Sequence, residues 1–216
     1  EQYLYKVYAS EDFYKEHQAV FEGMEVELVS DQVMKEISDT MTPQGVLALV
    51  RMLEYSLEDL LQQENPLLLV LENLQDPGNL GTILRTGEGA GINGIIMSRE
   101  TVDIYNPKVT RSTMGSIFRV PFVYVDDLFE VIKMMKDRNI TTYAAHLNGT
   151  DYTRESYTSG TAFLIGNEGN GLTDELTDNA QKKIKIPMCG RVESLNAAMA
   201  SGLLVYEARR QRQGVD

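Results

Sequence analysis

The feature that most limits the fold of this chain is the segment LLLVL at residues 67–71, which contains no polar residue. A strand with one face in solvent alternates apolar and polar side chains, whereas an unbroken apolar run is typical of a strand buried on both faces. Such strands occur in parallel sheets whose faces are covered by helices. The segment therefore predicts a strand inside a parallel α/β sheet.

Strand-like and helix-like segments alternate along the rest of the chain. The expected strands are residues 67–71, 94–97, 119–124, 141–145, 162–165 and 183–186. The expected helices are residues 79–89, 107–113, 127–138, 172–180 and 196–213. Because alternating strands and helices build parallel sheets, we expect residues 67–216 to form one α/β domain, with a mostly parallel sheet and helices on both faces.

The first third of the chain has its own alternating pattern. Strands are expected at residues 3–9, 25–29 and 45–52, and helices at residues 11–23 and 31–38. Ser10 and Ser30 precede the two helices and are suitable N-caps. We therefore assign residues 1–53 to a small N-terminal α/β domain. Residues 54–66 are acidic and polar and end in proline, so a linker with a helical turn is expected there.

The 216 residues carry a net charge of −12, which is spread unevenly. Residues 1–65 hold four basic and 14 acidic side chains, and residues 66–216 hold 16 basic and 18 acidic ones. The total charge argues against a general nucleic-acid binder. The larger part is nearly neutral, however, and can still present a local basic patch.

Composition also excludes several classes of protein. No run of about 18 apolar residues is present, so no transmembrane helix is expected, and the first residues lack the features of a signal peptide. The single cysteine, Cys189, cannot form an internal disulfide, and with only two histidines a zinc site is unfavourable. We therefore expect a cytoplasmic protein with no membrane partner and no metal.

Three segments at strand ends are rich in glycine, asparagine and small polar residues. They are NLQDPGNLGTILRTGEGAG at residues 73–91, AFLIGNEGNGL at 162–172 and IPMCGRVESLNAAMASGLLVY at 186–206. Each alone has an ordinary structural explanation: a glycine-rich turn before a surface Arg85, a flexible turn around Glu168, and a helix N-cap at Ser194 or Asn196. Strand ends are also where α/β sheets bind ligands. The first segment matches neither the dinucleotide-binding nor the P-loop glycine pattern.

Together, in this order and spacing, the segments resemble the three motifs of the SpoU (TrmH-like) branch of the SPOUT superfamily, S-adenosylmethionine-dependent RNA ribose 2′-O-methyltransferases. The matching stretches are residues 79–85, 166–171 and 186–196, within a resemblance that covers residues 66–213. The N-terminal third resembles the ribosomal-protein-like substrate-binding domain of this family, most clearly in SDTMTPQGVLALV at residues 38–50. That domain is expected to start before residue 1 and to be truncated here.

The resemblance implies a trefoil knot near the C-terminus, a homodimer with cofactor sites near its interface, and S-adenosylmethionine as the cofactor. It makes Arg85 the catalytic arginine. Because a guanidinium is a poor base, we expect Arg85 to bind a phosphate beside the target ribose and to polarise the 2′-hydroxyl, and the sequence leaves open whether it also accepts the proton. Asn79, Glu168, Ser194 and Asn196 then orient Arg85, the ribose and the cofactor. The residues implied to bind the cofactor are Ala145, His146, Gly166, Asn167, Ile186 and Leu195.

Several alternatives stay open at this point. His146 by itself is more simply a loop histidine than a base. Ribosomal RNA is the expected target, because small transfer-RNA members of the family often lack the accessory domain, and transfer RNA is the alternative. A non-catalytic RNA-binding assembly factor is disfavoured because every key polar position is filled. A nucleotide-binding regulatory domain would explain the glycines but not Arg85 and Glu168. Cofactor titration separates these classes.

Overall fold

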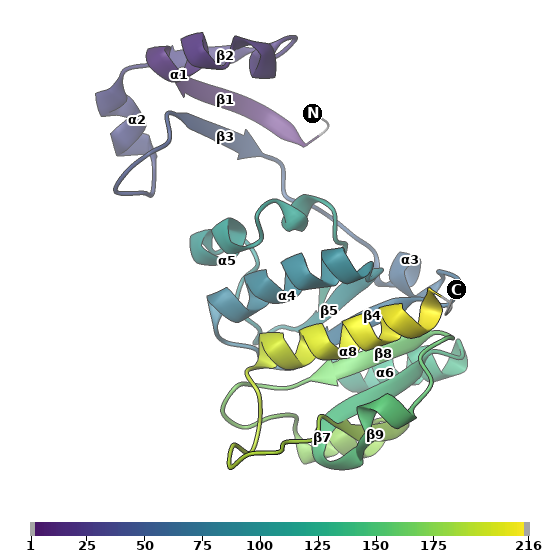
Figure 1. Ribbon diagram of the computed structural model, residues 1–216. Helices are drawn as coiled ribbons and strands as arrows, with labels where there is room; N and C mark the ends of the chain where they lie inside the picture. Colours follow the sequence, from purple (N-terminus) through teal and green to yellow (C-terminus); the bar gives the residue numbers. More distant parts are fainter. Residues whose placement is uncertain (1–2, 214–216) are drawn as a thin grey trace. The chain divides into compact units, whose positions relative to one another are not determined.

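The computed structural model describes residues 3–213 and divides the chain into two compact units, Glu1–Glu54 and Tyr55–Asp216. The smaller unit contains a three-stranded sheet of order β2-β1-β3, in which β1 is parallel to β2 and antiparallel to β3. Its elements are β1 Leu4–Ser10, α1 Glu11–Glu16, a 3-10 helix Gln18–Phe21, β2 Val26–Val29, α2 Asp31–Ile37 and β3 Val46–Val50 (Figure 1). The predicted strands and helices of this unit are thus present.

Serine side chains start both helices of the smaller unit, as predicted. Ser10 Oγ and Ser30 Oγ each accept a hydrogen bond from the backbone N–H three residues further on, at 3.4 and 3.3 Å. The first helix is shorter than expected: it ends at Glu16 instead of residue 23. The chain continues as a 3-10 helix, which buries Phe21 in a small core with Val7.

The larger unit contains a six-stranded sheet of order β6-β5-β4-β8-β7-β9, and each of these strand pairs is parallel. Its strands are β4 Leu67–Leu71, β5 Gly94–Ser98, β6 Phe122–Val125, β7 Thr141–Asp151, β8 Thr161–Ile165 and β9 Lys182–Lys185. Its helices are α3 Leu57–Leu61, α4 Pro77–Ala90, α5 Pro107–Ser112, α6 Leu128–Asp137, α7 Asp174–Asn179 and α8 Ala197–Arg212, with 3-10 helices at Ser116–Phe118 and Tyr152–Arg154. Every residue of β4 is buried, and the parallel α/β sheet predicted from LLLVL is confirmed.

Helices cover both faces of this sheet (Figure 1). On one face α4 and α8 lie side by side, and Gly202 of α8 leaves room for Thr86 of α4. On the other face α3, α6 and α7 share a core cluster with Leu68 and Val70 of β4. Side chains of a strand alternate between its two faces, so the intervening Leu69 points to the α4 face. With both faces covered, ligands can reach this sheet at its strand ends.

Residues 54–66, expected to be a linker with a helical turn, contain the short helix α3, whose N-cap is Ser56. Leu60 and Leu61 of this helix are each only 2% exposed and belong to the core of the larger unit. The segment is acidic and polar overall, but two of its apolar residues, Leu60 and Leu61, lie on the side of the helix that faces the core.

Two strands also differ from their expected bounds. β6 begins three residues later than predicted because the backbone N–H groups of Arg119 and Val120 donate to Ser116, and Pro121 after them has no N–H to donate. β7 continues past its expected end and pairs with Ile184 of β9 twice, through Ala145 and through Thr150. Residues 146–149 form a bulge between these two pairings, so β7 is longer than its apolar segment.

Candidate active site at the strand ends

The segments singled out in the sequence follow strands that are neighbours in the sheet. β4, β8, β7 and β9 are consecutive and parallel, so their carboxyl ends meet at one edge. Ala145 pairs with Ile184 of β9, and the residue before it pairs with Leu164 of β8. The fold therefore brings Ala145, Gly166 and Ile186, three of the predicted cofactor residues, to adjacent strand ends.

Asn79 joins the three segments through its side-chain amide. Its Nδ2 donates a hydrogen bond to Glu168 Oε1 at 2.9 Å, and its Oδ1 accepts one from Asn196 Nδ2 at 2.8 Å. Asn196 is also the N-cap of α8, where its Oδ1 accepts from the backbone N–H of Ala198. Asn79 is 9% exposed. This buried amide, bonded through both its nitrogen and its oxygen, connects the starts of α4 and α8 to the loop after β8.

Glu168 accepts hydrogen bonds from three donors. Besides Asn79, the backbone N–H groups of Gln75 and Asp76 donate to its carboxylate at 3.1 and 3.0 Å. Partial burial raises the pKa of Glu168. The hydrogen bonds from Asn79 and from backbone N–H groups lower it by more than burial raises it, so the pKa lies below its ordinary value. Glu168 is therefore a carboxylate at neutral pH and orients Asn79 and the turn before α4.

The side chain of Asn167 shapes the loop that contains it. Its Oδ1 accepts from the backbone N–H groups of Gly169 and Asn170, and its Nδ2 donates to the backbone oxygen of Asn73 at 2.8 Å. The backbone N–H and C=O of Asn167 are bonded to Gly171. These contacts hold the loop in place, and direct binding of a cofactor by Asn167 stays a prediction.

Gly166 is required by the packing of the chain against itself. A Cβ atom at this position would lie 2.0 Å from the carbonyl carbon of Gly171 and 2.1 Å from the backbone nitrogen of Leu172. Distances this short are far inside van der Waals contact, so any side chain would displace the loop. The sequence predicted that Gly166 allows a close approach, and the nearest approaching group in the structure is the loop itself.

Arg85 differs from these residues because nothing in the described structure binds its side chain. It lies on α4, six residues after Asn79, and its side chain is exposed. Within residues 3–213 it makes neither a hydrogen bond nor an ion pair. Its guanidinium is therefore free to bind a partner from outside the chain.

The connection from β9 to α8 also has unused hydrogen-bonding groups. Neither the backbone nor the side chains of residues 187–195 make a hydrogen bond within the part of the chain that the structure describes. Ile186 and Leu195 at its ends are half-buried, and Ser194 is exposed. His146 lies in the bulge of β7, where its Nδ1 accepts from the backbone N–H two residues on. Free backbone groups beside apolar side chains suit a flat ligand with polar edges.

Two further polar residues support the site, and the sequence analysis missed both. Glu72, which follows β4 and is 8% exposed, accepts from the backbone N–H and the hydroxyl of Thr173, both at 2.8 Å. Thr173 is the N-cap of α7. Ser98, at the end of β5, donates to Asn73 Oδ1 at 2.8 Å. The signal was present, since each is a polar residue at the end of a buried apolar strand.

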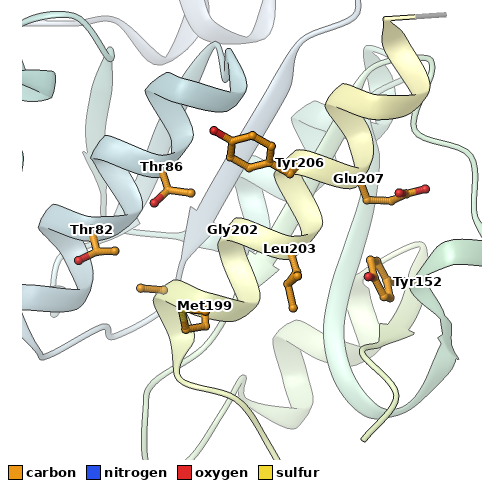
Figure 2. Close-up of a pocket in the computed structure, with 9 residues that line it drawn as sticks. Thr82, Thr86, Tyr152, Met199, Gly202, Leu203, Tyr206 and Glu207 are labelled. Carbon is orange, nitrogen blue, oxygen red and sulfur yellow. The ribbon is translucent and has the colours of Figure 1, made fainter. Parts of the chain in front are cut away.

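A groove of 440 Å³ lies along α4 and α8. Figure 2 shows the side chains that line it. Thr82 and Thr86 of α4 line it together with Met199, Leu203 and Tyr206 of α8. The three α8 side chains are between 39% and 60% exposed, so this helix presents apolar surface to solvent.

No group of three or more His, Cys, Asp or Glu side chains in residues 3–213 is placed to hold a metal ion. None of the helices described for these residues combines the length and the apolar character that a membrane-spanning segment needs.

A parallel α/β sheet with three polar motifs joined at its carboxyl edge is the arrangement that the sequence resemblance implied, and comparison with known proteins assigns the family. The model of the SpoU rRNA Methylase family matches residues 66–206. A second model, of the MRM3-like substrate binding domain, matches residues 2–48. This chain belongs to the SpoU rRNA methylase family. The predicted family and the predicted class of enzyme, an RNA methyltransferase, are confirmed.

Individual relatives match over most of their length. RlmP of Bacillus subtilis (strain 168), a 23S rRNA (guanosine(2553)-2′-O)-methyltransferase, is 32% identical over 194 residues, which cover 87% of this chain and 73% of RlmP. The SpoU methyltransferase AviRb from Streptomyces viridochromogenes, in complex with AdoMet, has a TM-score of 0.86 and 29% identity, covering 97% of this chain and 83% of AviRb. The AdoMet-bound rRNA methyltransferase from Sinorhizobium meliloti has a TM-score of 0.84 and 34% identity, covering 96% of this chain and 80% of that one.

Proposed function

We propose that this protein transfers a methyl group from S-adenosylmethionine to a ribose 2′-hydroxyl of ribosomal RNA. The observation that carries the proposal is the series of hydrogen bonds from Glu168 through Asn79 to Asn196, which joins all three motifs near an arginine without a partner in the described chain. The activity in the name of RlmP supports the 2′-hydroxyl and the ribosomal target. The AdoMet complexes of two structural relatives support the donor.

S-adenosylmethionine is the methyl donor, and the strand ends fit it. Residues 187–195 offer backbone N–H and C=O groups that no described residue occupies, and Ile186 and Leu195 offer half-buried apolar contacts for an adenosine ring. Ala145 and Gly166 complete the edge on the neighbouring strands. When bound, the donor supplies a methyl group on a positively charged sulfur, which departs as a neutral thioether while the 2′-hydroxyl proton passes to water.

Arg85 acts on the RNA. A guanidinium stays protonated at neutral pH, so Arg85 serves as a positive charge and hydrogen-bond donor rather than as a base. Its planar fork fits a phosphate next to the target ribose and leaves an N–H to polarise the 2′-hydroxyl. Ser194, exposed and without a hydrogen bond among the described residues, contacts the ribose or the cofactor. Orienting groups in this way supplies several kcal/mol of the barrier reduction.

The proposal includes a homodimer formed by the groove face of α4 and α8. Met199, Leu203 and Tyr206 form an exposed apolar patch beside the groove (Figure 2). Such patches are typical of surfaces that bind another protein. A second copy would cover them in a two-fold interface. Light scattering at micromolar concentration tests this point, and a monomeric mass with full activity would contradict it.

A trefoil knot is the topological part of the proposal. α8 packs on α4 on one side, while near its C-terminal end Gln211 donates to the backbone oxygen of Glu155 and Arg212 donates to those of Tyr157 and Ser159. Those oxygens belong to the connection between β7 and β8. The contacts of the last helix with these two separate segments support a threaded C-terminus.

The remaining parts of the proposal concern the domains and the cell. Residues 1–53 would form an RNA substrate-binding domain and residues 67–216 the catalytic domain, which the match to the MRM3-like substrate binding domain supports. A cytoplasmic location is also part of the proposal. Transfer RNA is the second candidate target, and a non-catalytic assembly factor is the third possibility.

Mapping 2′-O-methylation in RNA from cells with and without the gene tests the function directly. We expect one ribosomal nucleotide to lose its methyl group when the gene is deleted. Loss from a transfer RNA instead would replace the target. Unchanged RNA, together with no binding of S-adenosylmethionine in calorimetry, would favour the assembly factor.

A further inference from the structure

The segment after β5 concentrates positive charge in an acidic protein. Residues 106–120, which we name the α5 segment, contain three basic and no acidic side chains, whereas the whole chain has a net charge of −12. Lys108 and Arg111 are exposed and lie three residues apart, on the same side of α5. Among residues 3–213 neither side chain has an acidic partner. Both charges are therefore available to an anion.

The α5 segment is fixed to the helix that carries Arg85. A Cβ atom on Gly81 of α4 would lie 1.6 Å from Ser112 Oγ, so the two helices touch there. Two turns further along α4, Glu88 accepts hydrogen bonds from Ser116 and Arg119.

Positions 81, 85 and 88 lie on one side of a helix. Arg85 therefore lies between the two points at which α4 contacts the α5 segment. Lys108 and Arg111 thus lie on an element that packs against the helix of Arg85.

The α5 segment also exposes two large apolar side chains. Met114 is 69% exposed and has a φ of 50°, in the left-handed region that favours glycine, and Phe118 is 41% exposed. Neither side chain belongs to the buried core of the protein. Exposed aromatic rings beside free cations are the combination with which proteins bind single-stranded nucleic acid, through base stacking and phosphate contacts.

We propose that the α5 segment binds the RNA strand next to the methylated nucleotide. Lys108 and Arg111 bind successive phosphates, and Phe118 stacks on a base, while Met114 contacts the same strand. The inference rests on the proposed function for its choice of RNA, because the RNA strand whose phosphate is assigned to Arg85 continues along the α5 segment. It assigns part of RNA recognition to the catalytic unit itself, in addition to the N-terminal unit.

A matched pair of double variants tests the proposal in the full chain. Lys108→Gln/Arg111→Gln removes two charges from the surface. Lys133→Gln/Lys136→Gln removes two charges of the same spacing from α6, which covers the other face of the sheet. The probe is a set of unmodified ribosomal RNA transcripts in overlapping fragments. Affinity is measured over a series of salt concentrations, alongside S-adenosylmethionine affinity and molecular mass.

We expect the α5 variant to bind RNA about tenfold more weakly near physiological salt and to lower the slope of log affinity against log salt by about 1.4, the value for two single-strand phosphates. The α6 variant should match the wild type. Phe118→Ala should weaken binding about 5- to 150-fold with little change in the slope, because stacking releases no counterions. Cofactor affinity should stay unchanged in all variants.

Equal weakening by the α5 and α6 variants would overturn the proposal, because it would indicate a general charge effect. Loss of the dimer in the α5 variant would overturn it as well and would make the segment an interface between copies. Methyl transfer by the wild type is scored separately. If it is absent while the α5 variant alone is weakened in binding, the proposed function fails and the RNA-binding surface stands.

Discussion

Asn79 and Arg85 lie six residues apart on the same helix, and their side chains differ in a way that separates two tasks of the site. Asn79 is buried, and both ends of its amide are bonded to the other two motifs. Arg85 is exposed and has no partner among residues 3–213. Groups that the protein satisfies internally set the shape of the site, whereas a group left unsatisfied is available to a substrate.

This contrast predicts opposite phenotypes on one helix. A variant at the free residue should lose activity without losing stability, and a variant at the bonded residue should lose stability first. Four measurements test that division, taken from the largest expected effect to the smallest.

Arg85→Ala should lower single-turnover methyl transfer by at least about 100-fold, or about 2.7 kcal/mol of barrier, because its contacts act mainly in the transition state. The unfolding temperature and S-adenosylmethionine affinity should change little. Arg85→Lys should not restore the rate, since an ammonium lacks the planar fork. Near-normal turnover of Arg85→Ala would reject its catalytic assignment, and a parallel loss of cofactor affinity would make it a cofactor residue.

Gly166→Ala should destabilise the protein by about 3 kcal/mol, at the upper end of the usual cost of overpacking, because the added methyl overlaps Gly171 and Leu172. Denaturant unfolding followed by circular dichroism measures this free energy. Gly23→Ala is a useful comparison, because a Cβ at Gly23 meets nothing within 4 Å and pays only for its positive φ of 80°. A fully stable Gly166→Ala variant would show that the loop can move aside.

Asn79→Ala should lower the free energy of unfolding by about 1–3 kcal/mol, because it leaves Glu168 and Asn196 each without one hydrogen-bond partner. Its methyl-transfer rate should fall as the loops shift. In Asn79→Ala we expect stability and cofactor affinity to fall together, whereas in Arg85→Ala both should change little. Wild-type stability in Asn79→Ala would remove the amide from its structural role.

The pH dependence of stability gives the smallest effect. The pKa of Glu168 is lower in the folded chain than its ordinary value of 4.5, so its carboxylate stabilises the fold above that pH, and the contribution disappears as the pH falls through the folded-state pKa. The difference in unfolding free energy between the wild type and Glu168→Gln should therefore be present at pH 7 and shrink below about pH 4.5. We expect less than about 1 kcal/mol, because water screens this exposed group. A difference that grows on acidification would contradict the hydrogen-bond assignment.

Local sequence signals determined most of the elements. Ser10 and Ser30 cap helices through bonds to residues three positions away, so a short stretch of sequence contains all the interacting groups. The buried strand β4 follows from its own five apolar residues. The order and spacing of the three motifs identified the family, because each motif is a contiguous stretch.

The site was decided by pairs of residues that are distant in the sequence. Asn79 and Glu168 are 89 residues apart, Asn79 and Asn196 are 117 apart, and Glu72 and Thr173 are 101 apart. Only the order of strands in the sheet brings these pairs together, and no local pattern encodes which amide oxygen meets which donor. For the same reason the sequence did not show that Leu60 and Leu61 of the expected linker are buried, because the core that covers them is assembled from distant strands. Sequence alone named Arg85, but only the tertiary structure showed that its side chain is left without a partner in the described chain, because this availability depends on every neighbour that the fold places around it.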